Sequence, residues 1–188
     1  MSNMGILETI EDVLDRLISL DYEIGESNEV VQEKLGFIIF GGTALLLYNN
    51  SRMTSDIDII LLGNIDLNKG NIKEILKNHS VVPNNAIIQY PYLKEVISRA
   101  VPINAPFENI EVSVTSKEDL ALSKIFSSRP EDERDLIHTN ILDEADIEIV
   151  RKRYDEYLPN YLGGLGFLPD LDMLLRLRDE FKKEQIVL

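Results

Sequence analysis

The sequence predicts a mixed α/β (α+β) fold, in which a small mixed β-sheet with flanking helices is followed by a helical C-terminal part. Short runs rich in β-branched and aromatic residues, such as "FIIF" and "NIEVSVT", are interspersed with helical periodicity over the first two-thirds of the chain. The last third shows helical periodicity alone. The 188 residues, 44% of them hydrophobic, are enough for a well-buried core.

The N-terminal half supplies most of the expected sheet. Apolar residues at helical spacing predict a first helix over residues 6–20, and Gly25 is expected in the turn that follows. The next elements expected are a strand at 37–40, a helix that starts just after Gly41-Gly42 and ends near Tyr48, a strand at 56–62, a helix within "NKGNIKEILKNH" and a strand at "AIIQY".

The second half begins with the most regular strand pattern, because residues 109–115 alternate with period two. Ser116 followed by Asp119 fits a capping box and predicts a helix start. Further helices are expected within "EDERDLIHTNI", "EADIEIVRKRYDEYL" and "PDLDMLLRLRDEFKKE". We therefore expect a core over residues 1–127 and a helical subdomain over 128–188, either separate or packed as one domain with the core.

Composition excludes several classes of protein. No apolar run reaches the roughly 18 residues of a membrane span. The absence of cysteine excludes disulfides and thiolate metal sites, and fits a cytoplasmic protein. The net charge of -14 disfavours non-specific binding to nucleic acid, so an RNA substrate would need a local basic cluster. The candidates for such a cluster are Arg52, Lys94, Arg99, Lys124 and Arg129.

The stretch "FIIFGGTALLLYNNSRMTSDIDIIL" carries the strongest functional signal. A strand that leads through Gly41-Gly42 into a helix predicts a phosphate site, to which Thr43 adds a hydroxyl donor. Alternation along a strand places Asp56 and Asp58 on one face. Two adjacent carboxylates are costly to bury without a cation, so a Mg²⁺ site is favoured over a solvent-exposed strand end.

Glu111, on the later strand, is a candidate third carboxylate. If that strand lies beside the first, the three acids could hold two ions roughly 4 Å apart. An ordinary acid on a half-exposed strand face is an equally good interpretation of Glu111.

These motifs resemble the nucleotidyltransferase superfamily with the polymerase-beta-like core. Within it, "GGTALLLYNNSRMTSDIDIIL" is similar to the bacterial AbiEii-type and DUF6036-like nucleotidyltransferases. The similarity continues in "SKEDLALSKIFSSRPEDERDL", where such families carry a lysine, an arginine and two aspartates three residues apart. Lys124, Arg129, Asp132 and Asp135 occupy these positions, although Glu131 replaces the basic residue expected before Asp132.

The resemblance implies metal-dependent transfer of a nucleoside monophosphate from an NTP to an acceptor. Asp56, Asp58 and Glu111 would be the catalytic residues and the ligands of Mg²⁺ or Mn²⁺. The nucleotide would be held by Gly41, Gly42, Thr43, Arg52 and Lys124. The acceptor could be RNA, protein or a small molecule, and the sequence does not choose among them.

Other interpretations remain open at this point. The chain could be an inactive protein of this fold that binds a nucleotide or a partner, or the toxin half of a toxin–antitoxin pair with an antitoxin as partner. Lys124 could equally be a solvated helix residue, and Asp132 and Asp135 could pair structurally with Arg129 and Arg134. The two histidines, His79 and His138, lack ligand-spaced partners and are expected at the surface.

Overall fold

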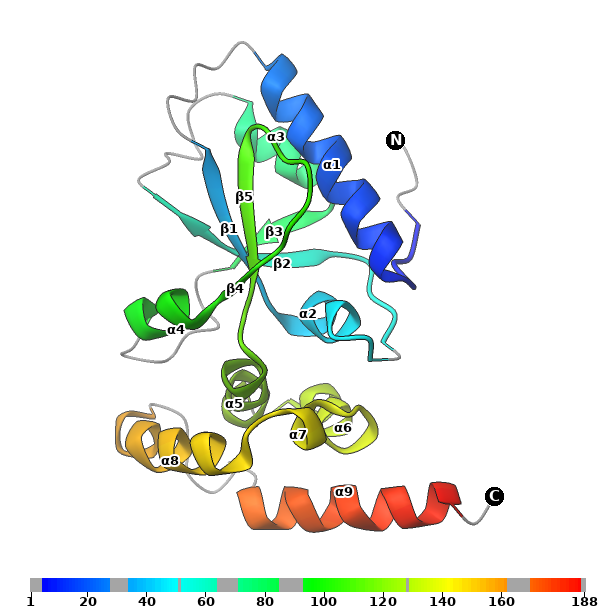
Figure 1. The fold of residues 1–188 in the computed structure, drawn as a ribbon, viewed down its shortest axis with the longest axis vertical. Helices are drawn as coiled ribbons and strands as arrows, with labels where there is room; N and C mark the ends of the chain where they lie inside the picture. Colours follow the sequence, from blue (N-terminus) through cyan, green and yellow to red (C-terminus); the bar gives the residue numbers. More distant parts are fainter. Residues whose placement is uncertain are drawn as a thin grey trace. The chain divides into compact units, whose positions relative to one another are not determined.

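The structure, a computed structural model, describes residues 5–27, 34–50, 52–63, 71–84, 93–127, 129–161 and 170–186. It confirms the mixed α/β fold (Figure 1). The chain divides into two compact units, one formed by residues 1–85 with 99–115 and the other by residues 86–98 with 116–188. The strand expected at "AIIQY" lies outside the described residues.

The first unit is built on a mixed sheet, which has five strands within the described ranges, in the order β3-β2-β1-β5-β4. The central strand β1 pairs antiparallel with β2 and parallel with β5, and both neighbours are continued outward by short edge strands. The strands are β1 (Leu35–Ile39), β2 (Ile57–Leu62), β3 (Val81–Pro83), β4 (Val101–Pro102) and β5 (Ile110–Val114). Prolines end both edge strands, which limits further pairing.

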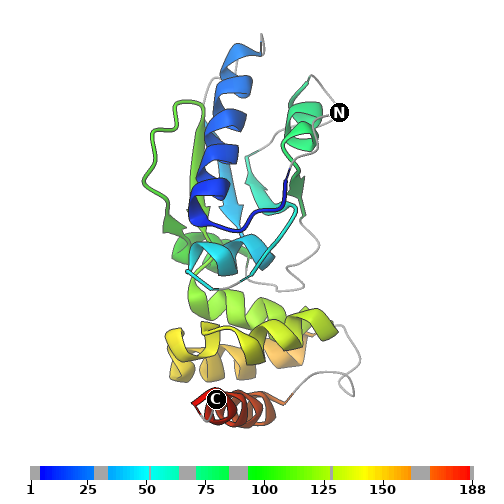
Figure 2. The ribbon, with the colours of Figure 1, turned by 90° about the vertical axis from the view of Figure 1, so that its right-hand side faces the viewer.

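In the described part of the first unit, three helices accompany this sheet. They are α1 (Ile10–Glu26), α2 (Gly41–Leu47) and α3 (Ile72–Asn78), and α1 packs against the other two. From the side, α1 crosses in front of the strands (Figure 2). The turn expected at Gly25 is wrong, because α1 continues through it: a Cβ there would lie 2.6 Å from the Asn109 amide nitrogen. Glycine thus serves a close approach within a helix rather than a turn.

The second unit is helical. Its elements are α4 (Leu93–Arg99), α5 (Lys117–Ser127), α6 (Pro130–His138), α7 (Ile141–Glu144), α8 (Ile147–Tyr157), the 3₁₀ turn η1 (Leu158–Asn160) and α9 (Leu171–Ile186). The last residue of α4, Arg99, is assigned to the first unit, and the rest of that helix to the second. Ser116 caps α5 as expected, since its hydroxyl accepts a hydrogen bond from the Asp119 N–H at 3.2 Å. Phe126 of α5 stacks on Tyr154 of α8, with 5.5 Å between ring centroids.

The unit boundary differs from the one expected after residue 127. Helix α5 packs on α6 and α8, and so belongs with the C-terminal helices. No helix in the described part of the chain is long and apolar enough to cross a membrane.

Candidate nucleotide and metal site

The predicted aspartates lie where β2 begins, beside the start of α2. Asp56 occupies the bend directly before β2, and Asp58 is the second residue of the strand. Ile57 and Ile59 between and after them are fully buried, whereas both aspartates are half-buried. The strand therefore alternates as the sequence predicts, with apolar side chains in the core and carboxylates toward solvent.

Gly41 brings the Asp58 carboxylate close to the main chain. Its φ of +68° is in the left-handed region, and a Cβ at this position would lie 2.8 Å from Oδ2 of Asp58. The N–H of Phe40 also donates to the main-chain oxygen of Asp58 at 3.2 Å. Glycine suits this position because, without a Cβ, it adopts the positive φ without strain and leaves room for the Asp58 carboxylate.

Two threonines hold Asp56. The Thr43 hydroxyl of α2 donates to the main-chain oxygen of Asp56 at 2.7 Å, and the Thr54 hydroxyl donates to its Oδ1 at 3.1 Å. Because Thr43 is buried and this hydrogen bond uses its hydroxyl proton, it positions Asp56 instead of offering the phosphate donor that the sequence suggested. Arg52 lies next to the glycines, with Nε 3.6 Å from a Cβ built on Gly42.

A family described as a nucleotidyltransferase of unknown function (DUF6036) matches residues 15–162. The chain belongs to this family. No curated protein and no solved structure matches it in the corresponding comparisons.

In this family member, Glu111 does not join the two aspartates, which corrects the expected three-carboxylate site. Glu111 and Leu62 both pair with Gly36 of β1, so Glu111 is level with Leu62. Asp58 precedes Leu62 by four residues, or about 13 Å at 3.3 Å per residue. Glu111 is thus on the same face of the sheet but at the opposite end, and is exposed to solvent.

The end of β5 level with Asp58 carries Val114 and Thr115, neither of which has a carboxylate. Among the described residues, no group of three or more His, Cys, Asp or Glu side chains could hold a metal ion. A metal at this end of the sheet would therefore rest on the oxygen atoms of Asp56 and Asp58, which are ligands of the kind that Mg²⁺ prefers.

Lys124 of the second unit, expected to be either a nucleotide contact or a solvated helix residue, is a buried cation paired with two carboxylates. Its side chain is 3% exposed, and its Nζ lies 2.8 Å from Oδ1 of Asp132 and 2.7 Å from Oδ2 of Asp135. The Nε of Arg129 completes the cluster by donating to Oδ2 of Asp132 at 2.6 Å. The pairing of Asp132 with Arg129 was foreseen, but the main partner of both aspartates is Lys124.

These contacts also set the protonation of Asp132. Burial alone would raise the pKa of Asp132, but the Lys124 charge and hydrogen bonds from Lys124, Ser127 and Arg129 outweigh it. The pKa of this carboxyl is accordingly below its ordinary value. Because Lys124 is enclosed in this way, it is also removed from the basic residues proposed to meet an RNA acceptor.

Sequence reasoning missed Arg16, which holds the segment that carries Asp56. It is buried on α1, and its guanidinium donates to the main-chain oxygens of Ser55 at 2.9 Å and Gly5 at 2.6 Å. Burial lowers the pKa of this guanidinium, while the charges of Asp12 and Asp56 raise it. The available signal was a charged residue on the apolar face of α1, next to Leu17.

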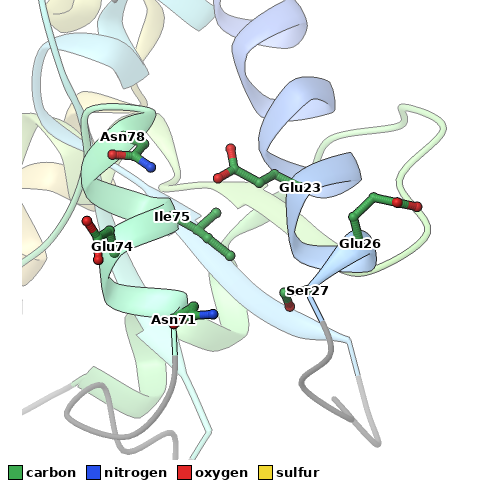
Figure 3. A pocket seen from close by; sticks show the side chains of 7 residues that line it. All are labelled: Glu23, Glu26, Ser27, Asn71, Glu74, Ile75 and Asn78. Carbon is green, nitrogen blue, oxygen red and sulfur yellow. The ribbon is translucent and has the colours of Figure 1, made fainter. Parts of the chain in front are cut away.

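A separate acidic pocket of about 410 Å³ lies between the C-terminal end of α1 and α3 (Figure 3). Glu23, Glu26 and Glu74 are among its lining residues, and none of the predicted site residues is. Glu23 is also the side-chain partner of His79, because its Oε2 lies 2.7 Å from Nε2 of that ring. The expectation that His79 lies at the surface is wrong, since the residue is 4% exposed.

Proposed function

We propose that the protein is a metal-dependent nucleotidyltransferase that moves a nucleoside monophosphate from an NTP to an acceptor. The observation that carries this proposal is the pair Asp56 and Asp58 at one end of the sheet, with the Asp58 carboxylate against the Gly41 turn. Membership of a family described as nucleotidyltransferases supports the same reaction class.

Asp56 and Asp58 would hold Mg²⁺ or Mn²⁺, and Gly42 with Arg52 would hold the triphosphate beside them. The bound ion would neutralise charge on the triphosphate and stabilise the charge that develops on the leaving pyrophosphate. The acceptor hydroxyl oxygen forms a bond to the α-phosphorus and gives up its proton to solvent. The bond from that phosphorus to the oxygen it shares with the β-phosphorus breaks, and this oxygen leaves with pyrophosphate. Thr43, Thr54 and Arg16 keep Asp56 in place, which is the positioning that phosphoryl transfer requires.

A binding role without turnover is the second candidate, and the position of Glu111 favours it. A site with two carboxylates has fewer ligands for a second metal ion than the three-carboxylate site expected from the sequence. Under this alternative the protein would bind NTP with a divalent ion but transfer nothing.

One experiment separates these two functions. Each of the four labelled NTPs is incubated with the protein, Mn²⁺ or Mg²⁺, and total RNA, total protein or small-molecule extract, and both label transfer and NTP binding are measured. The transferase predicts transfer to one acceptor class, and the binding role predicts NTP affinity with no transfer.

Asp58→Asn keeps the shape of the side chain and removes its charge, so both functions predict a large loss of metal-dependent NTP affinity. Glu111→Gln removes one charge from the same face of the sheet and is the matched control. Equal NTP affinity with excess EDTA and with Mg²⁺ would exclude the metal site altogether.

A further inference from the structure

A second groove, away from the aspartates, lies between α1 and the segment that leads into β5. It has a volume of about 500 Å³ and lies within the first unit. Three of its lining residues are apolar or aromatic: Ile18 and Tyr22, one helical turn apart on α1, are 39% and 69% exposed, and Pro106 comes from the segment that leads into β5. Exposed apolar side chains that gather in one groove indicate a binding surface more strongly than scattered ones.

The walls of this groove are fixed before any partner arrives. The buried carboxylate of Asp21 accepts the main-chain N–H groups of Glu108, Asn109 and Ile110 at 2.7–2.9 Å. The Asn109 side chain in turn donates to the main-chain oxygen of Asp21 at 3.0 Å, and packs against Gly25. A preformed groove spares a ligand the entropic cost of ordering it.

The charge at the rim has one sign. Glu26 and Glu108 both line the groove and are exposed, and neither side chain has an ion-pair partner within the described residues. The groove also meets the C-terminal end of α1, where the helix dipole is negative and the last turn contains no basic residue. Lys34, whose ammonium donates a hydrogen bond to the main-chain oxygen of Phe107 at 2.9 Å, is not among the residues that line the groove.

We propose that this groove binds a short basic segment of a partner polypeptide, in which an apolar side chain is flanked by lysine or arginine. The apolar side chain packs between Ile18, Tyr22 and Pro106, and the flanking cations reach Glu26 and Glu108. Nucleic acid does not fit, because its phosphates would meet two carboxylates and a negative helix end. A second copy of the chain fits poorly as well, since each copy carries a net charge of -14.

The test begins with selection of displayed random 12-residue peptides on the full-length protein. We expect the enriched peptides to place lysine or arginine on both sides of an aromatic or aliphatic residue. A selected peptide is then synthesised and its Kd is measured by fluorescence anisotropy. Binding should weaken as salt is raised, because the rim contacts are exposed ion pairs.

The double variant Glu26→Gln/Glu108→Gln should weaken binding about tenfold, and Tyr22→Ala by at least as much. The matched control is Glu8→Gln/Glu11→Gln, which removes two exposed charges near the N-terminal end of α1, away from the groove, and should change Kd less than twofold. Circular dichroism checks that all variants are folded.

Three results would overturn the proposal. They are a selection that enriches no peptide or only peptides without basic residues, an equal loss of affinity in the control, and gel filtration in which Tyr22→Ala converts a dimer into a monomer. The last result would show that a second copy covers the groove. None of these measurements depends on catalytic activity, so the proposal stands or fails separately from the proposed function.

Discussion

Replacing Lys124 with methionine tests whether this lysine is a structural cation or a nucleotide ligand. The substitution keeps an unbranched side chain of similar length but removes the charge that lies between Asp132 and Asp135. Asp132 retains Ser127 and Arg129 as partners, at 2.6 Å in each case. The carboxylate of Asp135, whose side chain is 7% exposed, loses the Lys124 ammonium that lies 2.7 Å away.

The magnitude follows from that burial. Removing one partner of a buried ion pair costs about 3–5 kcal/mol, since it leaves an uncompensated charge away from water. A protein of this size loses roughly 2–4 °C in Tm for each kcal/mol, so we expect Tm to fall by about 10 °C. In Lys124→Met/Asp135→Asn the buried charge of Asp135 is removed as well, and part of the lost stability should return.

The assay is urea and thermal unfolding followed by circular dichroism, together with NTP affinity. Lys182→Met is the matched control, because it breaks a surface pair with Asp143 in which the lysine is 46% exposed, and should cost less than about 1 kcal/mol. If Lys124→Met is no more destabilising than this control, but lowers NTP affinity, the structural assignment of Lys124 is refuted.

Three further predictions concern the site and the buried cluster. Gly41→Ala should cost at least about 1–2 kcal/mol of unfolding free energy and abolish metal-dependent NTP binding, because of the positive φ and the nearby Asp58 carboxylate; a fully active, stable variant would contradict this. Glu111→Gln should leave NTP affinity within twofold in a titration with Mg²⁺, and a tenfold loss would return Glu111 to the site. Because the folded state lowers the pKa of Asp132, its stabilising effect should be complete above the unfolded pKa of about 3.9 and disappear as pH falls through the lower folded pKa. The stability difference between the protein and Asp132→Asn should therefore be largest near neutral pH and shrink below about pH 4, and a pH-independent difference in urea unfolding would exclude the charged cluster.

The sequence by itself predicted the parts of this protein that depend on neighbouring residues. The strand at β2, the helix that follows Gly41, the cap of α5 and the alternation of Asp56 and Asp58 with buried isoleucines all follow from periodicity and local backbone preferences. The nucleotidyltransferase family was also evident from the sequence, because its motif spans one short continuous segment.

Only the tertiary structure decided how distant segments meet. The alternation of β5 correctly implies the face of Glu111, but its level along the sheet depends on register with β1, which a period of two does not specify. Lys124 has the same spacing whether it faces solvent or two buried carboxylates, and the packing of α6 on α5 selects the second. Arg16 reaches Ser55 across 39 residues of sequence, so its positioning role has no local signature.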